Sequence, residues 1–219
     1  MPRPSRWNDI IEAAAEAFRT KGFAATSLED IASAVGIWKG SLYHYINTKE
    51  DLLFAVVREP ATEILNELRE LSNMDLPPTE KIRHATRSHL RVLEKNFVYA
   101  SVYLQEIAGR RQYQDWAAKD REYLDLLESI VEEGVETGEF SALTNPRVAT
   151  LGLIGALNWL THWYRPEGPL RADEIAEQFC DLFLGGLISR SSAPTTKRAR
   201  SASSASPPSK PRPNSRKTA

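Results

Sequence analysis

The stretch SLEDIASAVGIWKGSLYHYINTKEDLL, residues 27–53, carries the strongest local pattern in the chain. Ser27 precedes an apolar run and has Asp30 three residues after it, the spacing of a helix N-cap and its capping-box partner. Gly36 follows this run and can take the positive φ of a tight turn. A second helix is predicted to begin near Trp38 or Lys39 and to last about two turns. Two short helices around a glycine turn form a helix-turn-helix, whose second helix can enter a DNA major groove.

The predicted second helix is polar on its outward side. This side holds Lys39, Gly40, Ser41, Tyr43 and His44. Cationic and hydroxyl donors, an aromatic ring and a glycine suit contact with phosphates and base edges. The apolar side, expected to face the core, consists of Leu42, Tyr45 and Ile46.

Helical signals flank this pair on both sides. Apolar residues recur at helical spacing from Trp7 to Phe18, and Gly22 supplies a stop. Thr48 is expected to cap a further helix with acids in its first turn. Residues 1–53 are therefore predicted to form an N-terminal three-helix DNA-binding domain.

With its flanks, this region resembles the DNA-binding domain of the tetracycline-repressor-like (TetR) family over residues 10–53, notably in AAAEAFRTKGFAATSLEDIASAVGIWKGSLYHYINTKEDLL. Trp38 departs from the pattern, because many members have a small polar residue there. It either packs on the DNA backbone or a thymine methyl, or extends the core. The alternative, a helical corner that binds no nucleic acid, does not account for the matching flanks. The resemblance implies DNA contacts at Thr26, Ser27, Lys39, Gly40, Ser41, Tyr43, His44 and Lys49.

Composition indicates a cytoplasmic protein. The chain has 219 residues, enough for one or two domains, and a single cysteine, Cys180, which excludes an internal disulfide and is expected to be a buried thiol. No long apolar run or signal-peptide pattern is found, so no membrane association is expected.

Charge is segregated along the chain. Residues 51–189 hold 14 Lys/Arg against 23 Asp/Glu, whereas residues 190–219 hold eight Lys/Arg and no acid. The C-terminal stretch is rich in Ser, Pro and Ala and lacks periodic apolar residues, so a disordered basic tail is predicted. Two interpretations stay open for it: a loose clamp on DNA phosphates, or a solvated extension without a role.

Helical periodicity continues from residue 49 onward, and strand-like alternation is absent. The fold class is therefore all-α, with nine or ten helices. Pro60 is expected to kink the fourth helix without ending it. Residues 54–189 are predicted to form a larger helical domain for ligand binding and dimerisation.

The last two predicted helices, residues 147–165 and 172–189, are suited to a partner subunit. The first mixes bulky apolar residues with Gly152 and Gly155, which permit close helix approach, and the second carries Ile175, Phe179 and Leu182 on one seam. Packing within the monomer is the alternative. A homodimer is favoured because a helix-turn-helix of this kind reads two half-sites.

Residues 155–187 also resemble the C-terminal part of a TetR subgroup that answers to acyl-CoA thioesters from fatty-acid and sterol degradation. The resemblance implies a homodimeric repressor that binds a palindromic operator and is released by such an effector. An acyl chain needs an apolar tunnel between helices. The candidate lining residues are Tyr103, Ile107, Trp116, Tyr123, Trp159 and Trp163. For any single aromatic residue among them, ordinary core packing is the favoured alternative.

The phosphates of such a ligand require cations. Arg83, Arg87, Arg91 and Lys95 form an i, i+4 ladder, which is unfavourable unless acids or an anion lie opposite. The ladder is either a salt-bridged solvated face, neutralised by the acid-rich helix at residues 113–137, or a phosphate site with Arg87 and Arg91 as ligands. Arg110 is a rival phosphate ligand.

Enzymatic activity is not expected. No phosphate loop, nucleophile elbow or paired metal-ligand motif is found, so no cofactor and no metal site are predicted. His84 and His89 do not share a helix face as metal ligands at i, i+4 would. The competing function is a regulator of the same fold that senses a lipophilic drug-like cation and controls efflux.

Overall fold

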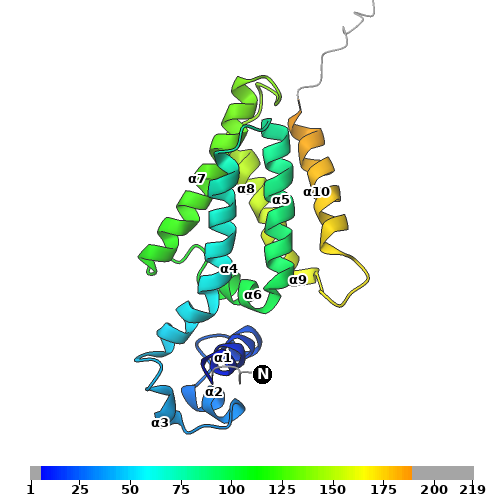
Figure 1. Cartoon of the computed structure of the whole chain (residues 1–219). Coiled ribbons are helices and arrows are strands. Elements are labelled where there is room, and N and C mark those ends of the chain that lie inside the picture. The colour runs from blue at the N-terminus through cyan, green and yellow to red at the C-terminus, as the bar shows by residue number, and fades with distance from the viewer. Residues whose placement is uncertain (1–5, 189–219) are drawn as a thin grey trace, which may run out of the picture. The chain divides into compact units, whose positions relative to one another are not determined.

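The computed structural model describes residues 6–188 and confirms the all-α prediction. Within this range ten helices are formed and strands are absent, apart from one isolated bridge between Phe140 and Ile188. The predicted tail, residues 190–219, lies outside the described part. The helices are α1 (Arg6–Lys21), α2 (Leu28–Ala34), α3 (Lys39–Leu42), α4 (Lys49–Ser72), α5 (Pro78–Lys95), α6 (Phe97–Glu106), α7 (Gln114–Glu136), α8 (Pro146–Asn158), α9 (Leu160–Trp163) and α10 (Ala172–Leu187) (Figure 1).

Two apolar cores organise these helices. The first, called here the N-terminal core, fills the space among α1 to α3 and the first half of α4, with Phe18, Ile31 and Leu42 fully buried. The second lies among α5, α7, α8, α10 and the far half of α4. Helix α4 crosses the predicted boundary between residues 53 and 54 and contributes to both cores. It also continues through Pro60, as predicted.

Two predicted boundaries are wrong. Helix α3 has one turn, not two, because the chain turns after Leu42 to bury Ile46 and to present the amides of Asn47 and Thr48 to the Asp51 carboxylate. Tyr45 is 44% exposed and stacks on Trp7, so it is not a core residue. The second error concerns the helix expected over residues 147–165, which divides into α8 and α9.

Candidate DNA-binding surface and effector pocket

Both predicted caps position the helix-turn-helix. The Ser27 hydroxyl accepts from the Asp30 amide, and the Asp30 carboxylate accepts from the Ser27 amide in return. The hydrogen bond from the Ser27 hydroxyl, supported by the Ser27 amide and by Lys21, lowers the pKa of Asp30 to about 2. The same reciprocal box joins Thr48 and Asp51 at the start of α4. Helices α2 and α4 are therefore fixed on either side of α3.

The turn between α2 and α3 has the predicted geometry. Gly36 has φ of 67°, and the Ile37 amide donates to the Ala32 carbonyl at 3.0 Å. Ala32 and Ile31 are fully buried, so α2 presses closely on its neighbours. A side chain at position 36 would be strained by this backbone conformation.

Most residues predicted to contact DNA form an exposed surface around α3. Trp38, at the N-cap of α3, is 88% exposed, which answers the question left open by the sequence: it does not extend the core. Tyr43 is 51% exposed in the turn after α3. The other members of this surface are Ser27, Lys39, Gly40 and His44, which are exposed, and Ser41, which is half-buried.

Thr26 and Lys49 have internal roles instead. Thr26 is 1% exposed, and its hydroxyl donates to the Gly22 carbonyl at 2.8 Å. The Lys49 ammonium donates to the carbonyls of Phe23 (2.7 Å), Ala24 (3.5 Å) and Thr26 (2.8 Å). An ammonium has three donors, so all of them are engaged. The expectation that these two side chains contact DNA is corrected: they hold the turn between α1 and α2.

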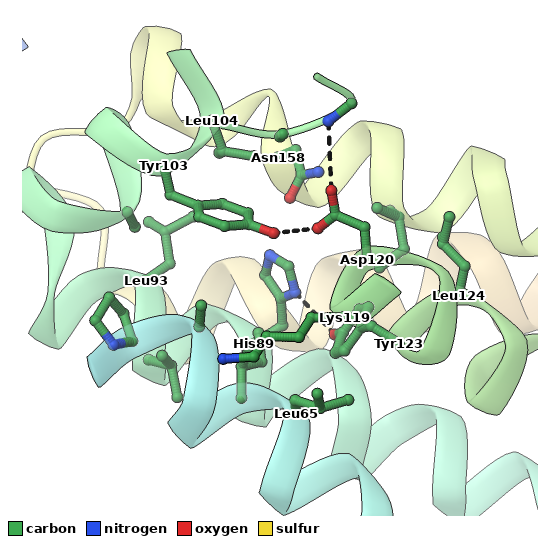
Figure 2. Close-up of a pocket in the computed structure, with 18 residues that line it drawn as sticks. Leu65, His89, Leu93, Tyr103, Leu104, Lys119, Asp120, Tyr123, Leu124 and Asn158 are labelled. Atoms are coloured by element: carbon green, nitrogen blue, oxygen red, sulfur yellow. Dashed lines mark hydrogen bonds between the residues drawn. The ribbon is translucent and has the colours of Figure 1, made fainter. Parts of the chain in front are cut away.

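An apolar cavity of about 290 Å³ lies among α4 to α8 (Figure 2). Most of its walls are aliphatic, and a few polar side chains converge on it, the usual composition of a small-molecule site. The lining residues are Pro60, Ala61, Ile64, Leu65, His89, Val92, Leu93, Ala100, Tyr103, Leu104, Ala108, Gly109, Lys119, Asp120, Tyr123, Leu124, Ile154 and Asn158.

Two hydrogen-bonded groups form the polar part of this cavity. The Tyr103 hydroxyl donates to one oxygen of Asp120, and the Gly109 amide donates to the other oxygen at 3.3 Å. His89 Nδ1 lies 3.0 Å from the Tyr123 hydroxyl, and the same ring is hydrogen-bonded to Asn158. Burial lowers the pKa of His89 to about 4, so the imidazole is neutral at pH 7. Burial also raises the pKa of both tyrosines, which keeps their hydroxyl protons in place.

The predicted ligand-binding residues are only partly brought together. Tyr103 and Tyr123 line the cavity. Ile107 and Trp116 belong to the N-terminal core, where Trp116 stacks on Phe54. Trp159 and Trp163 are 59% and 42% exposed, and neither lines this cavity. These four assignments are corrected, because Ile107 and Trp116 serve the core and Trp159 and Trp163 lie on an outer face.

The arginine ladder is a salt-bridged face, and its acids come from helices other than the expected one. Glu177 of α10 pairs with Arg83 and Arg87, and Glu63 and Glu67 of α4 pair with Arg91. Lys95 also pairs with Glu63. The prediction of a partner helix at residues 113–137 is therefore wrong.

None of the three predicted phosphate ligands lines the cavity. Arg87 and Arg91 are held by the acids described above. Arg110 donates to the Gln105 carbonyl at 2.9 Å and to Glu106 at 3.2 Å. The sequence does not single out the cavity residues His89, Lys119, Asp120 and Asn158. A signal exists for His89: it lies between Ala85 and Leu93 at i−4 and i+4, a polar residue on an apolar helix face.

Helix α6 connects the cavity to the DNA-binding part. Its Tyr103 and Leu104 line the cavity, whereas its Val102 is buried in the N-terminal core. At its last residue, the Glu106 carboxylate accepts from the Phe23 amide at 3.0 Å, in the turn between α1 and α2. Glu106 and Lys49 thus hold the amide and the carbonyl of the same residue, Phe23.

A helix-turn-helix with an exposed polar surface, joined to a helical body that contains an apolar cavity, defines a class of DNA-binding regulators. Residues 10–56 match the model of bacterial regulatory proteins of the tetR family, and residues 75–187 match the tetracyclin repressor-like C-terminal domain. The chain therefore belongs to the TetR family of transcriptional regulators.

Several known members are similar over most of their length. The transcriptional repressor KstR2 of Mycolicibacterium smegmatis is 26% identical, covering 84% of this chain and 91% of that protein. The regulator PfmR of Thermus thermophilus is 31% identical with a TM-score of 0.73, covering 82% and 99%. AibR, solved in complex with isovaleryl coenzyme A and operator DNA, is 25% identical with a TM-score of 0.71, covering 81% and 97%.

In the described part of the chain, residues 6–188, no helix has the length and apolar character needed to cross a membrane.

Proposed function

We propose that the chain is a homodimeric repressor that reads a palindromic operator and is released by a small-molecule effector, an acyl-CoA thioester from lipid or sterol degradation. Residues 1–53 bind DNA, and residues 54–189 bind the effector and the second subunit. One observation supports the proposal above all: helix α6 lines the cavity and also binds the turn that precedes α2.

The proposed DNA contacts are those of the exposed surface around α3. Helix α3 presents Lys39 and the turn after it presents Tyr43, and both reach base edges and phosphates in one major groove. Two copies about 34 to 36 Å apart then read successive grooves on one face of the duplex. The proposed contact set is Ser27, Trp38, Lys39, Gly40, Ser41, Tyr43 and His44.

The proposed dimer interface is formed by α8 and α10. Val148 and Leu151 on α8 are 67% and 47% exposed, and Leu182 on α10 is 71% exposed. Gly155, Gly185 and Gly186 have no neighbour within 4 Å of an added Cβ, so the helix surfaces there are open. Ile175 is buried in the monomer core, so the interface side of α10 runs through Leu182 and not through Ile175.

The volume of the cavity limits how much of the effector can enter it. At roughly 30 Å³ per non-hydrogen atom, taken from the volume of water in the liquid, about 290 Å³ holds about ten atoms. An acyl group of medium length fits, whereas a coenzyme A moiety is far larger and has to stay outside. The complex of AibR with isovaleryl coenzyme A supports this ligand class.

The competing effector, a lipophilic cation, has one observation in its favour, the Asp120 carboxylate in the cavity wall. Lys119 lines the same cavity, however, and opposes a second positive charge. We therefore favour the acyl thioester.

Fluorescence anisotropy with fragments of the chain's own promoter tests both halves of the proposal. We expect specific binding that weakens by at least tenfold in Lys39→Ala and Tyr43→Ala proteins and is unchanged in Arg121→Ala, which removes an exposed cation on α7. Decanoyl-CoA should release the fragment, and free CoA should not. For near-complete release the ligand must prefer the free conformer by about 10⁴-fold. Equal binding of all fragments, or a strictly monomeric protein, contradicts the proposal.

A further inference from the structure

We infer that the acyl group that enters the cavity carries a hydroxyl, which donates to the Asp120 carboxylate and tightens binding relative to a ketone or an ammonium group at the same place. The inference rests on the proposed function in taking this cavity as the effector site. It follows from the direction of the hydrogen bonds around the cavity and from the formal charge of its walls.

The pair formed by Tyr103 and Asp120 presents acceptors. The Tyr103 hydroxyl directs its proton to Asp120, and the Gly109 amide occupies the second carboxylate oxygen (Figure 2). An ionised carboxylate has about four lone-pair sites, so about two of them are left for a ligand. The Tyr103 oxygen has lone pairs but no second proton. Beside Tyr103 and Asp120 a ligand carbonyl would meet acceptors, and its donors would have to come from Lys119 or Asn158 elsewhere in the lining.

The second pair, His89 Nδ1 and the Tyr123 hydroxyl, lies at a distance of 3.0 Å, so these two groups satisfy one another within the protein. Asp120 is therefore the group that selects the ligand atom bound here, because its carboxylate accepts from both Tyr103 and Gly109.

Charge then separates a hydroxyl from an ammonium group. Lys119 and Asp120 are the lining residues that carry a formal charge, because His89 is neutral. Their charges cancel, so the cavity has no net charge to offset the desolvation of a cation. A neutral donor satisfies the free acceptors without this cost.

Three compounds with one carbon skeleton test the inference: 2-decanol, 2-decanone and 2-aminodecane. Each has about the number of atoms that the cavity holds. Calorimetric titration of the full chain should give a Kd for the alcohol about tenfold lower than for the ketone, the difference expected for one hydrogen bond to a charged group. The amine should bind no more tightly than the alcohol.

Asp120→Asn provides the matched variant, because the amide has nearly the same shape but offers an N–H₂ donor to a ketone. We expect the preference for the alcohol to disappear or to reverse in this protein. Asp115→Asn, a change of an exposed aspartate in the first turn of the same helix, should keep the full preference. Thermal melts without ligand check that both variants fold.

A ketone that binds as tightly as the alcohol overturns the inference. Tighter binding of the amine, an alcohol preference that survives in Asp120→Asn, or no measurable binding of any of the three compounds does the same. Operator release by decanoyl-CoA is measured separately. If acyl-CoA releases the operator but the alcohol is not preferred, the hydroxyl inference fails and the proposed function stands. If the alcohol is preferred but no acyl-CoA releases the operator, only the thioester part of the proposed function fails.

Discussion

Replacement of Glu106 with alanine would remove the carboxylate that α6 extends to the turn between α1 and α2. The Glu106 side chain is 15% exposed, and it accepts from the Phe23 amide at 3.0 Å. Its oxygen also lies 3.6 Å from the place of a Cβ on Gly22, so the carboxylate lies directly over this turn. Loss of the side chain leaves a partly buried amide without its acceptor.

The size of the destabilisation follows from the loss of one hydrogen bond between the Glu106 carboxylate and the Phe23 amide. A hydrogen bond to a charged group contributes about 1.5 to 3 kcal/mol, so we expect Glu106→Ala to lower the free energy of unfolding by about 2 kcal/mol. The same change should loosen the turn that leads into the Ser27 cap of α2. A loss of about 2 kcal/mol corresponds to a factor of about 30 in the ratio of ordered to disordered turn. Operator binding should weaken accordingly, because only the ordered form presents α3 correctly.

Urea unfolding followed by circular dichroism measures the first effect, and anisotropy with the promoter fragment measures the second. Glu106→Gln should cost about half as much as Glu106→Ala, because the amide oxygen still accepts while the charge is lost. The control is Glu16→Ala, which breaks an exposed ion pair with Arg19 on α1 and should cost less than about 0.5 kcal/mol. If Glu106→Ala unfolds like this control and binds the operator normally, Glu106 does not hold the turn.

Three further outcomes follow from the described contacts. The pKa of His89 is lowered from 6.5 to about 4 in the folded protein, so the free energy of unfolding should fall as the pH drops from 6.5 to 4, by about 2 kcal/mol at pH 5. In urea titrations His89→Gln should remove this pH dependence, and the exposed His84→Gln should keep it. Leu182→Asp should give a folded monomer in light scattering, whereas an unchanged dimer would exclude this surface. Gly134→Ala should cost about 1 to 3 kcal/mol in urea unfolding, because an added Cβ would lie 2.2 Å from the Phe140 ring; wild-type stability would contradict this.

Local signals predicted the helix-turn-helix well, because its caps depend on residues close in sequence. The capping boxes at Ser27 and Thr48 each need only a partner three residues away, and both are formed. The length of α3 depends instead on Ile46 reaching the core and on Asp51 binding amides that precede α4. These tertiary contacts are not encoded in the local pattern of α3.

The cavity was harder to predict because its polar residues come from separate helices. The sequence indicated aromatic residues of the right type, but not which of them would face one another across α5, α6 and α7. The ion-pair ladder shows the same limit. Its cations were evident at i, i+4 spacing, whereas the acids opposite, such as Glu63 and Glu177, lie on helices that only the packing brings close.

Helix α6 gives a physical reason why occupancy of the cavity and operator binding should be linked. Tyr103, which donates to Asp120 in the cavity, and Glu106, which accepts from Phe23, are three residues apart and so about 4.5 Å apart along the helix axis. Gly109, three residues after Glu106, returns to Asp120 through its amide. A ligand that binds Asp120 therefore shares this carboxylate with contacts on both sides of Glu106. One short helix and the turn after it carry all three contacts. If the cavity is the effector site, we therefore expect a shift of this helix on ligand binding to move the Phe23 turn, and Glu106→Ala to perturb the same equilibrium.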